Sequence, residues 1–96
     1  MLTSKQRSYL RKLANREAAI LQIGKGGISP SLVEQVREAL EARELIKMHV
    51  LDNSDLSPRQ ACDLLAREIG AEGVQVVGGK IVLYKKSGEN PRIQLP

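Results

Sequence analysis

The stretch Ala19-Ile20-Leu21-Gln22-Ile23-Gly24-Lys25-Gly26-Gly27-Ile28-Ser29-Pro30-Ser31 decides the fold of this 96-residue chain. Its apolar opening, residues 19–23, predicts a short and largely buried strand. Ser29 followed by Pro30 predicts the start of a helix, because proline at the first helical position sacrifices no hydrogen bond. The glycine-rich turn therefore joins a strand to a helix, which is the first half of a strand–helix–strand unit.

The turn itself has the chemistry of a phosphate-binding loop. Its three glycines present backbone N–H groups without side-chain obstruction, and we expect the first helical turn to add unpaired donors and the positive end of its dipole. Lys25 adds a positive charge at the tip. The spacing fits neither the nucleotide P-loop nor the dinucleotide fingerprint, and is closer to the G-x-x-G loop with which KH-type modules clamp a nucleic-acid backbone. The alternative is a tight turn that needs glycine only for a positive φ.

The same cues place the other elements. We predict helices from Thr3 or Ser4 to about residues 14–16, from Ser29 to about 42–43 and from Ser57 to Gly70, and strands over 45–50, 74–77 and 80–84. For the second helix, a capping box of Ser31 with Glu34 offers an alternative start about two residues later. A crossover helix favours parallel pairing of the first two strands, and Gly78-Gly79 predicts a hairpin between the last two. The fold class is therefore α/β: a single small domain of order α-β-α-β-α-β-β, with a mixed four-stranded sheet packed with helices.

Composition limits the class of protein. The domain is expected over residues 1–85, followed by a polar, mobile tail over 86–96. A hydrophobic content of 42% and a charged content of 27% are typical of soluble globular proteins. No apolar stretch reaches the length of a membrane span, and the N-terminus lacks the apolar region of a secretory signal. The single cysteine cannot form an internal disulfide, so we expect a cytoplasmic protein. We also expect it to be monomeric when free.

The net charge of +4 is unevenly divided along the chain. Residues 1–28 carry six Lys or Arg against one acid, whereas residues 29–72 carry five against nine acids. Residues 73–96 again carry four bases against one acid. On the first predicted helix the basic residues lie apart from the apolar stripe and have no interleaved acid. This asymmetry favours a polyanionic partner contacted by one side of the domain.

Taken together, these motifs resemble the CRM domain family, named for chloroplast RNA splicing and ribosome maturation, in its stand-alone bacterial YhbY-like form. The matching segments cover nearly the whole chain: Lys5-Gln6-Arg7 with Leu10 and Leu13-Ala14, Ile23 to Gly27, Ala39 to Lys47, Gly73 to Gly78, Ile81 to Tyr84, and the closing Ile93, Leu95 and Pro96. The resemblance implies a fold like the C-terminal domain of bacterial translation initiation factor 3. It also implies RNA binding centred on the glycine loop, with the basic first helix beside it, and association with precursors of the large ribosomal subunit.

We therefore predict a non-enzymatic RNA-binding protein whose partner is large-subunit ribosomal RNA in pre-ribosomal particles. The expected RNA-binding residues are Lys5, Arg7, Arg11, Lys12, Arg16, Gly24, Lys25, Gly26, Gly27 and Ile28. Phosphate contacts by backbone N–H groups are expected from Gly26, Gly27 and Ile28. The chain contains no Phe or Trp and only two Tyr, so few aromatic side chains are present to stack on RNA bases. Recognition should therefore rest on shape and backbone geometry.

Two other functional classes remain open from the residues alone. A protein–protein adaptor could use the acidic second helix, whose acids are otherwise a solvated face, or an open face of the sheet. An enzyme acting on a phosphorylated small molecule would need a catalytic base and a deep pocket, for which the sequence offers no motif. Cys62 is expected to be a small buried hydrophobe and Tyr84 a packing residue. His49 has no second ligand near it in the sequence, so no metal site is expected. We also expect no cofactor, no small-molecule substrate and no membrane as partners.

Overall fold

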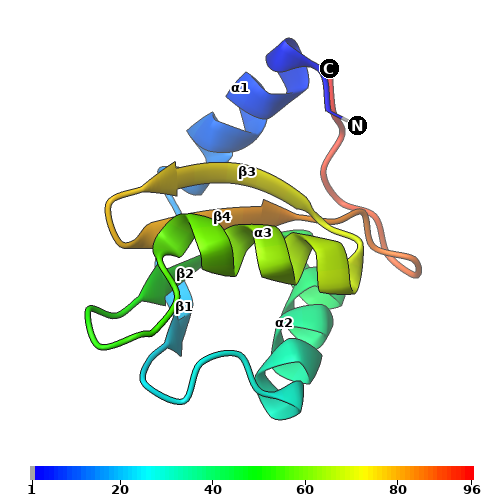
Figure 1. Cartoon of the computed structure of the whole chain (residues 1–96). Coiled ribbons are helices and arrows are strands. Elements are labelled where there is room, and N and C mark those ends of the chain that lie inside the picture. The colour runs from blue at the N-terminus through cyan, green and yellow to red at the C-terminus, as the bar shows by residue number, and fades with distance from the viewer. Residues whose placement is uncertain (1) are drawn as a thin grey trace.

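The computed structural model describes residues 2–96 and confirms the predicted order of elements (Figure 1). The elements are α1 (Ser4–Ala14), β1 (Ala19–Ile23), α2 (Pro30–Arg43), β2 (Leu45–Val50), α3 (Pro58–Ile69), β3 (Glu72–Val77) and β4 (Lys80–Tyr84). The strands form one mixed sheet in the order β1-β2-β4-β3. As predicted, β1 and β2 are parallel, and β3 and β4 form an antiparallel hairpin.

The helices cover the two faces of the sheet unequally. α2 and α3 pack on one face, where alternate β2 residues Ile46, Met48 and Val50 enter the larger hydrophobic core. α1 packs on the other face over a smaller core that contains Leu45 and Tyr84. In Figure 1, α1 lies above the sheet and α3 and α2 lie below it. The molecule is therefore a three-layer arrangement in which one layer is a single short helix.

The helix ends follow the sequence cues closely. The side-chain oxygen of Ser29 accepts the N–H of Leu32 at 3.1 Å, and Pro30 occupies the first turn of α2. α1 and α3 both begin with reciprocal capping boxes, formed by Thr3 with Gln6 and by Ser57 with Gln60. Gly70 ends α3 in the left-handed conformation with φ +77°.

The third strand begins earlier than predicted, at Glu72 rather than Val74. The pairing of β3 with β4 shifts register between Gly73 and Gln75, which breaks the alternation that sequence periodicity relies on. Gly73 also allows a close approach between layers, since a Cβ built there would lie only 2.9 Å from Cys62 Sγ. The bulge thus lies where α3 packs against the sheet.

Residues 86–96, for which a polar, mobile tail was expected, lie along the domain without regular secondary structure. Ile93 and Leu95 pack against the smaller core beneath α1. The side-chain amide of Gln6 in α1 donates to the carbonyl of Pro96 at 3.2 Å. Figure 1 shows the C-terminal segment running back beside the start of α1. The tail therefore helps to hold α1 on the sheet.

Candidate nucleic-acid interface

The glycine loop is a compact exposed turn at the end of β1. The N–H of Gly27 donates to the carbonyl of Gly24 at 3.0 Å, which closes the turn, and Gly27 has φ +68°. Lys25 and Gly26 form the exposed tip. The turn therefore has the left-handed glycine that the tight-turn alternative predicts, and its tip is exposed.

The geometry changes which backbone donors the loop can offer. Gly27 was expected to donate to phosphate, but its N–H is already bonded within the turn. The first turn of α2 is also largely satisfied, because Pro30 has no N–H and the N–H of Leu32 is bonded to Ser29. No acceptor within residues 2–96 takes the N–H of Gly26 or Ile28. The Gly26 and Ile28 N–H groups can therefore donate to an anion, and Ile28 is held in place by packing against the larger core.

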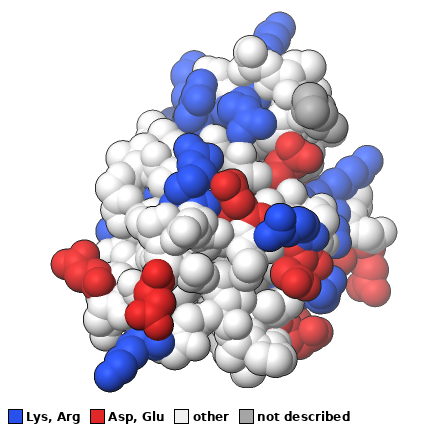
Figure 2. Space-filling view, in the orientation of Figure 1, with Lys and Arg blue, Asp and Glu red and all other residues white. Residues whose placement is uncertain are grey.

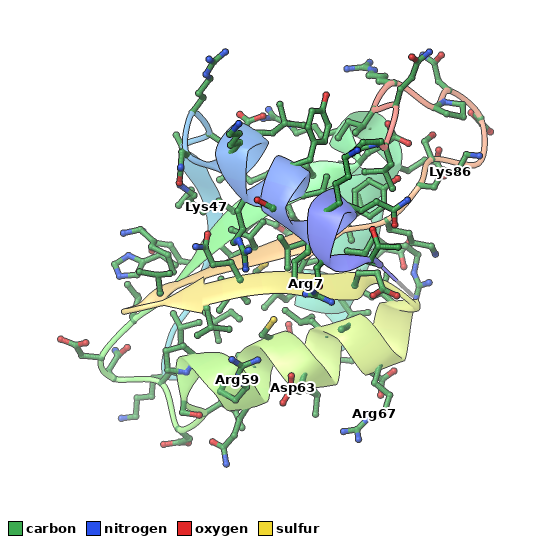
Figure 3. The ribbon with its side chains drawn as sticks, turned by 90° about the horizontal axis from the view of Figure 1, so that it is seen from above. Arg7, Lys47, Arg59, Asp63, Arg67 and Lys86 are labelled. Atoms are coloured by element: carbon green, nitrogen blue, oxygen red, sulfur yellow. The ribbon has the colours of Figure 1, made fainter. Side chains whose placement is uncertain are left out.

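The predicted basic residues of α1 fall into two groups. Lys5, Arg11, Lys12 and Arg16 are exposed, as a contact surface requires. Arg7 is half-buried, and its Nη1 donates to the carbonyl of Gly73 at 2.5 Å, with Val74 O at 3.4 Å. Figure 3 shows Arg7 between α1 and β3. The Arg7 guanidinium therefore links α1 to the bulge of β3 by hydrogen bonds. This structural role could not be predicted from the sequence.

The basic helix and the glycine loop are not neighbours, which corrects the arrangement that the resemblance implied. In Figure 1, α1 lies at the top and the loop between β1 and α2 at the bottom, with the sheet between them. Figure 2 shows Lys and Arg side chains gathered over α1, whereas both signs are mixed lower on the same face. An RNA that contacts both regions must cross the space between them.

The acids of α2 lie on an exposed face, as expected, but Glu44, which caps the end of the helix, does not. Glu44 is buried, and its carboxylate accepts the backbone N–H groups of Ser87 at 2.8 Å, Arg92 at 2.6 Å and Ile93 at 2.7 Å. Burial raises the pKa of Glu44, but these three hydrogen bonds outweigh it and hold the pKa below its ordinary value.

The side chain of Glu41 binds the start of the same tail. Its carboxylate accepts the Ser87 hydroxyl and the N–H groups of Gly88 and Glu89, which lower the pKa of Glu41. Glu41 is nevertheless exposed, as are the other two acids of α2, Glu34 and Glu38. Sequence periodicity could not show that Glu41 and Glu44 bind the tail, because their partners lie more than 40 positions away.

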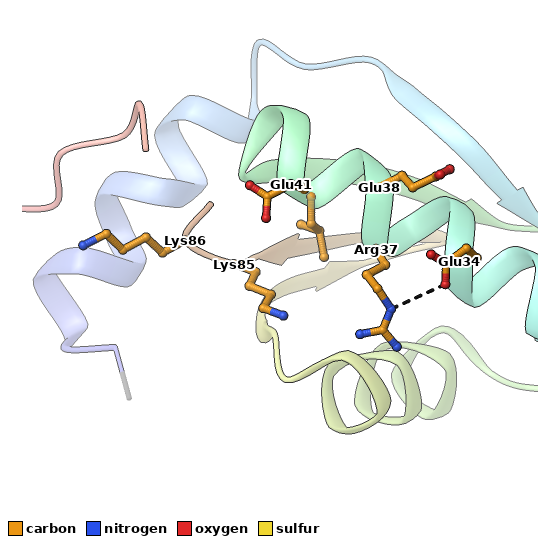
Figure 4. Close-up of a pocket in the computed structure, with 7 residues that line it drawn as sticks. Glu34, Arg37, Glu38, Glu41, Lys85 and Lys86 are labelled. Carbon is orange, nitrogen blue, oxygen red and sulfur yellow. Dashed lines mark ion pairs between the residues drawn. The ribbon is translucent and has the colours of Figure 1, made fainter. Parts of the chain in front are cut away.

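A cavity of about 310 Å³ lies between the end of α2 and the segment after β4 (Figure 4). It is lined by both signs of charge, including Glu38, Glu41 and Lys86, and Arg37 pairs with Glu34 at 3.7 Å. Lys85 donates from Nζ to the carbonyl of Ile69 at 3.0 Å, at the end of α3. This mixed lining has no net attraction for a polyanion and sets the cavity apart from the basic α1 surface.

The remaining candidate groups have structural roles. Cys62 is buried, and burial raises the pKa of its thiol, which keeps it protonated. Tyr84 is buried in the smaller core as predicted, and burial raises the pKa of its phenol. Over residues 2–96, no group of three His, Cys, Asp or Glu side chains is arranged to hold a metal ion. None of the helices in that range is long and apolar enough to span a membrane.

Comparison with known proteins agrees with this architecture. The model of the CRS1 / YhbY (CRM) domain matches residues 2–85. The chain is 45% identical to the Bacillus subtilis (strain 168) protein named "Probable RNA-binding protein YqeI", with all of both chains covered. It is 32% identical over 95 residues to a Haemophilus influenzae "RNA-binding protein", covering 99% of this chain and 95% of that one.

A plant protein and a solved bacterial structure are also similar to this chain. A 76-residue segment, 79% of this chain, is 30% identical to 8% of the "CRM-domain containing factor CFM2, chloroplastic" of Arabidopsis thaliana. The solution structure of a hypothetical Staphylococcus aureus protein, described as a candidate RNA-binding protein, superposes with a TM-score of 0.74 at 46% identity, covering both chains completely. The chain belongs to the CRS1/YhbY (CRM) domain family, and it matches short bacterial members of that family over their whole length.

Proposed function

We propose that this protein is a cytoplasmic, monomeric RNA-binding protein that attaches to structured ribosomal RNA in precursors of the large ribosomal subunit. The observation that carries the proposal is the exposed cationic surface formed by Lys5, Arg11 and Lys12 of α1 and by Arg16 just after it, with no interleaved acid. The relatives named as RNA-binding proteins support RNA as the polyanion. The large-subunit partner comes from the family resemblance.

The binding mechanism has an electrostatic part and a geometric part. The α1 cations attract the RNA and release its counterions, which supplies affinity without reading sequence. At the glycine loop, the N–H groups of Gly26 and Ile28 donate to a phosphate while Lys25 neutralises its charge. Bound in this way, the protein could hold an immature RNA conformation or exclude other assembly factors.

The proposal assigns no catalytic step to the chain. The Cys62 thiol is buried and protonated, and it lies in the core rather than at the glycine loop. Because the proposed contacts are to phosphates, the affinity for RNA should depend on RNA shape, show modest sequence preference and fall steeply with salt.

The test is equilibrium binding to a large-subunit ribosomal RNA transcript across a salt series. The variant Lys5→Ala/Arg11→Ala/Lys12→Ala/Lys25→Ala should lose affinity by a factor of 100 or more, and its salt slope should flatten by roughly 3, since each lost phosphate contact removes about 0.7–0.9. The matched control Arg37→Ala/Arg43→Ala/Arg59→Ala/Arg67→Ala removes the same charge from exposed positions of α2 and α3. Equal loss in both variants would show that only net charge matters. Ribosomal association that survives RNase would point to a protein adaptor instead.

A further inference from the structure

The sheet face that carries α1 is only partly covered by that helix. α1 and the tail cover the part that contains Leu45, Val74 and Tyr84. The helix ends at Ala14, and the next residue, Asn15, lines a cavity of about 170 Å³ on the remaining part of the face. The cavity is completed by Lys47, Gln75, Val77, Lys80 and Val82, so its lining within the described chain contains two lysines and no acid.

The strand register shows how the residues of this uncovered area are arranged in rows across the sheet. One row across the sheet is formed by Lys47, Val82 and Gln75, which are paired through β2, β4 and β3. The next row takes one residue from each strand: Gln22, His49, Lys80 and Val77. Paired residues on neighbouring strands point to the same face, so the two rows form one continuous surface.

This surface lies on the path between the two predicted contact regions. Asn15 connects it to the end of α1, and Figure 3 shows Lys47 beside that end of the helix. At the opposite side, Gln22 also lines a second cavity together with Gly24 and Gly26 of the glycine loop. The surface therefore spans the distance that separates α1 from the loop.

Its chemistry matches a single RNA strand. The ammonium groups of Lys47 and Lys80 are placed on neighbouring strands one row apart, where they can neutralise phosphates. Val77, the β3 partner of Lys80, is 58% exposed, and with the floor of Val82 it offers an apolar surface for a ribose or base beside those charges. The His49 ring lies against Gly79 of the hairpin, since a Cβ on Gly79 would lie 3.2 Å from its Cδ2 and Nε2 atoms. A half-buried ring at this position is a suitable stacking partner for an unpaired base.

We propose that this uncovered part of the sheet is a second RNA-contact surface, on which Lys47 and Lys80 hold the phosphates of a single strand passing from α1 to the glycine loop. The proposal rests on the proposed RNA-binding function and adds residues that the charge pattern of the sequence did not single out. It accounts for how one RNA reaches two regions at opposite ends of the molecule.

The first test is binding of the same ribosomal RNA transcript by Lys47→Gln/Lys80→Gln. The matched control is Arg59→Gln/Arg67→Gln, which removes two charges from exposed positions of α3, on the other side of the sheet. We expect the sheet variant to bind roughly tenfold more weakly, with a salt slope lower by about 1.4 as for two single-strand phosphates, and the control to change much less. Circular dichroism and thermal melting check that both variants are folded.

A second test needs no variant. Wild-type protein is photocrosslinked to transcript containing 4-thiouridine, and crosslinked peptides are mapped; we expect crosslinks in β2 and in the β3–β4 hairpin. If wild type binds but the sheet variant binds equally well, or if crosslinks are confined to α1 and the glycine loop, the second surface is refuted while the proposed function stands. If wild type does not bind the RNA at all, the proposed function itself fails.

Discussion

The carboxylate of Glu44 lies 2.7 Å from the backbone nitrogen of Ile93, across 49 positions of sequence. Glu44 adopts this position with φ +66° and ψ −33°, a sparsely populated positive-φ conformation that costs a residue with a side chain about 1–3 kcal/mol. Each backbone N–H bonded to a buried carboxylate contributes roughly 1.5–3 kcal/mol, and Glu44 accepts three. The hydrogen bonds therefore outweigh the strain, and Glu44 acts as the anchor of the tail.

Replacing Glu44 by Gln should release the tail. One oxygen becomes an NH₂ group that faces the backbone donors, so we expect a loss of roughly 2–4 kcal/mol in the free energy of unfolding. The carbonyl of the residue still accepts from Lys85 N, so the connection to β4 should persist. Urea unfolding measures the stability, and trypsin cleavage after Lys86 and Arg92 reports tail release. Glu38→Gln, on the exposed face of α2, should change neither quantity; unchanged cleavage in Glu44→Gln would contradict the anchor.

Acid should weaken the same anchor in wild type. The folded-state pKa of Glu44 and of Glu41 is held below the ordinary value of 4.5, so the stability from these groups is fully present above that pH. It is lost as pH falls from about 4.5 through the folded-state pKa values, because the protonated forms can no longer accept all of these hydrogen bonds. Urea unfolding at several pH values should show a shallower acid dependence in Glu44→Gln than in wild type. Equal slopes would mean that Glu44 does not control acid stability.

Local sequence cues predict the fold well because the helix starts are marked by caps and prolines at Ser29 and Ser57, and the hairpin by two glycines. They also place the exposed lysines of α1 and the glycine loop. They do not reveal the partners of Arg7, Glu41 and Glu44, which bind backbone groups more than 40 positions away. Such long-range contacts leave no periodic pattern in the sequence. A glutamate that binds backbone N–H groups therefore cannot be told from a solvated glutamate by sequence alone.

The close approach at Gly73 can be measured by a double-mutant cycle. Gly73→Ala introduces a Cβ 2.9 Å from Cys62 Sγ, a distance that forces the strand and α3 apart and should cost roughly 1–3 kcal/mol. Cys62→Ala removes the sulfur and should cost less because the residue is small. The double variant should be less destabilised than the sum of the two. Additive effects in thermal unfolding would show that the two residues do not compete for this space.

Arg7 and Arg11 form a charge-matched pair that separates anchoring from RNA contact. Arg7→Ala leaves the carbonyls of Gly73 and Val74 without their donor, so we expect a loss of about 1–3 kcal/mol in stability and little change in salt slope. Arg11→Ala should leave stability within about 0.5 kcal/mol and lower the salt slope by about 0.7–0.9. Chemical unfolding and RNA titration on both variants test this assignment. If the two substitutions lowered the salt slope equally, Arg7 would have to be counted among the residues that contact RNA.

Gly26 and Gly27 test whether the loop works by close backbone approach. Ala at Gly27 must adopt φ near +68°, which should destabilise the fold by about 1–2 kcal/mol. Gly26 has no positive φ, and a Cβ there meets nothing within 4 Å, so Gly26→Ala should fold as wild type. Its methyl group would nevertheless stand at the exposed tip, where a phosphate must approach the N–H. We therefore expect Gly26→Ala to weaken RNA binding roughly tenfold with unchanged thermal stability, because a charge-assisted hydrogen bond of about 1.5 kcal/mol is lost. Wild-type affinity in this variant would show that the loop is a structural turn, and that the basic surfaces alone bind RNA.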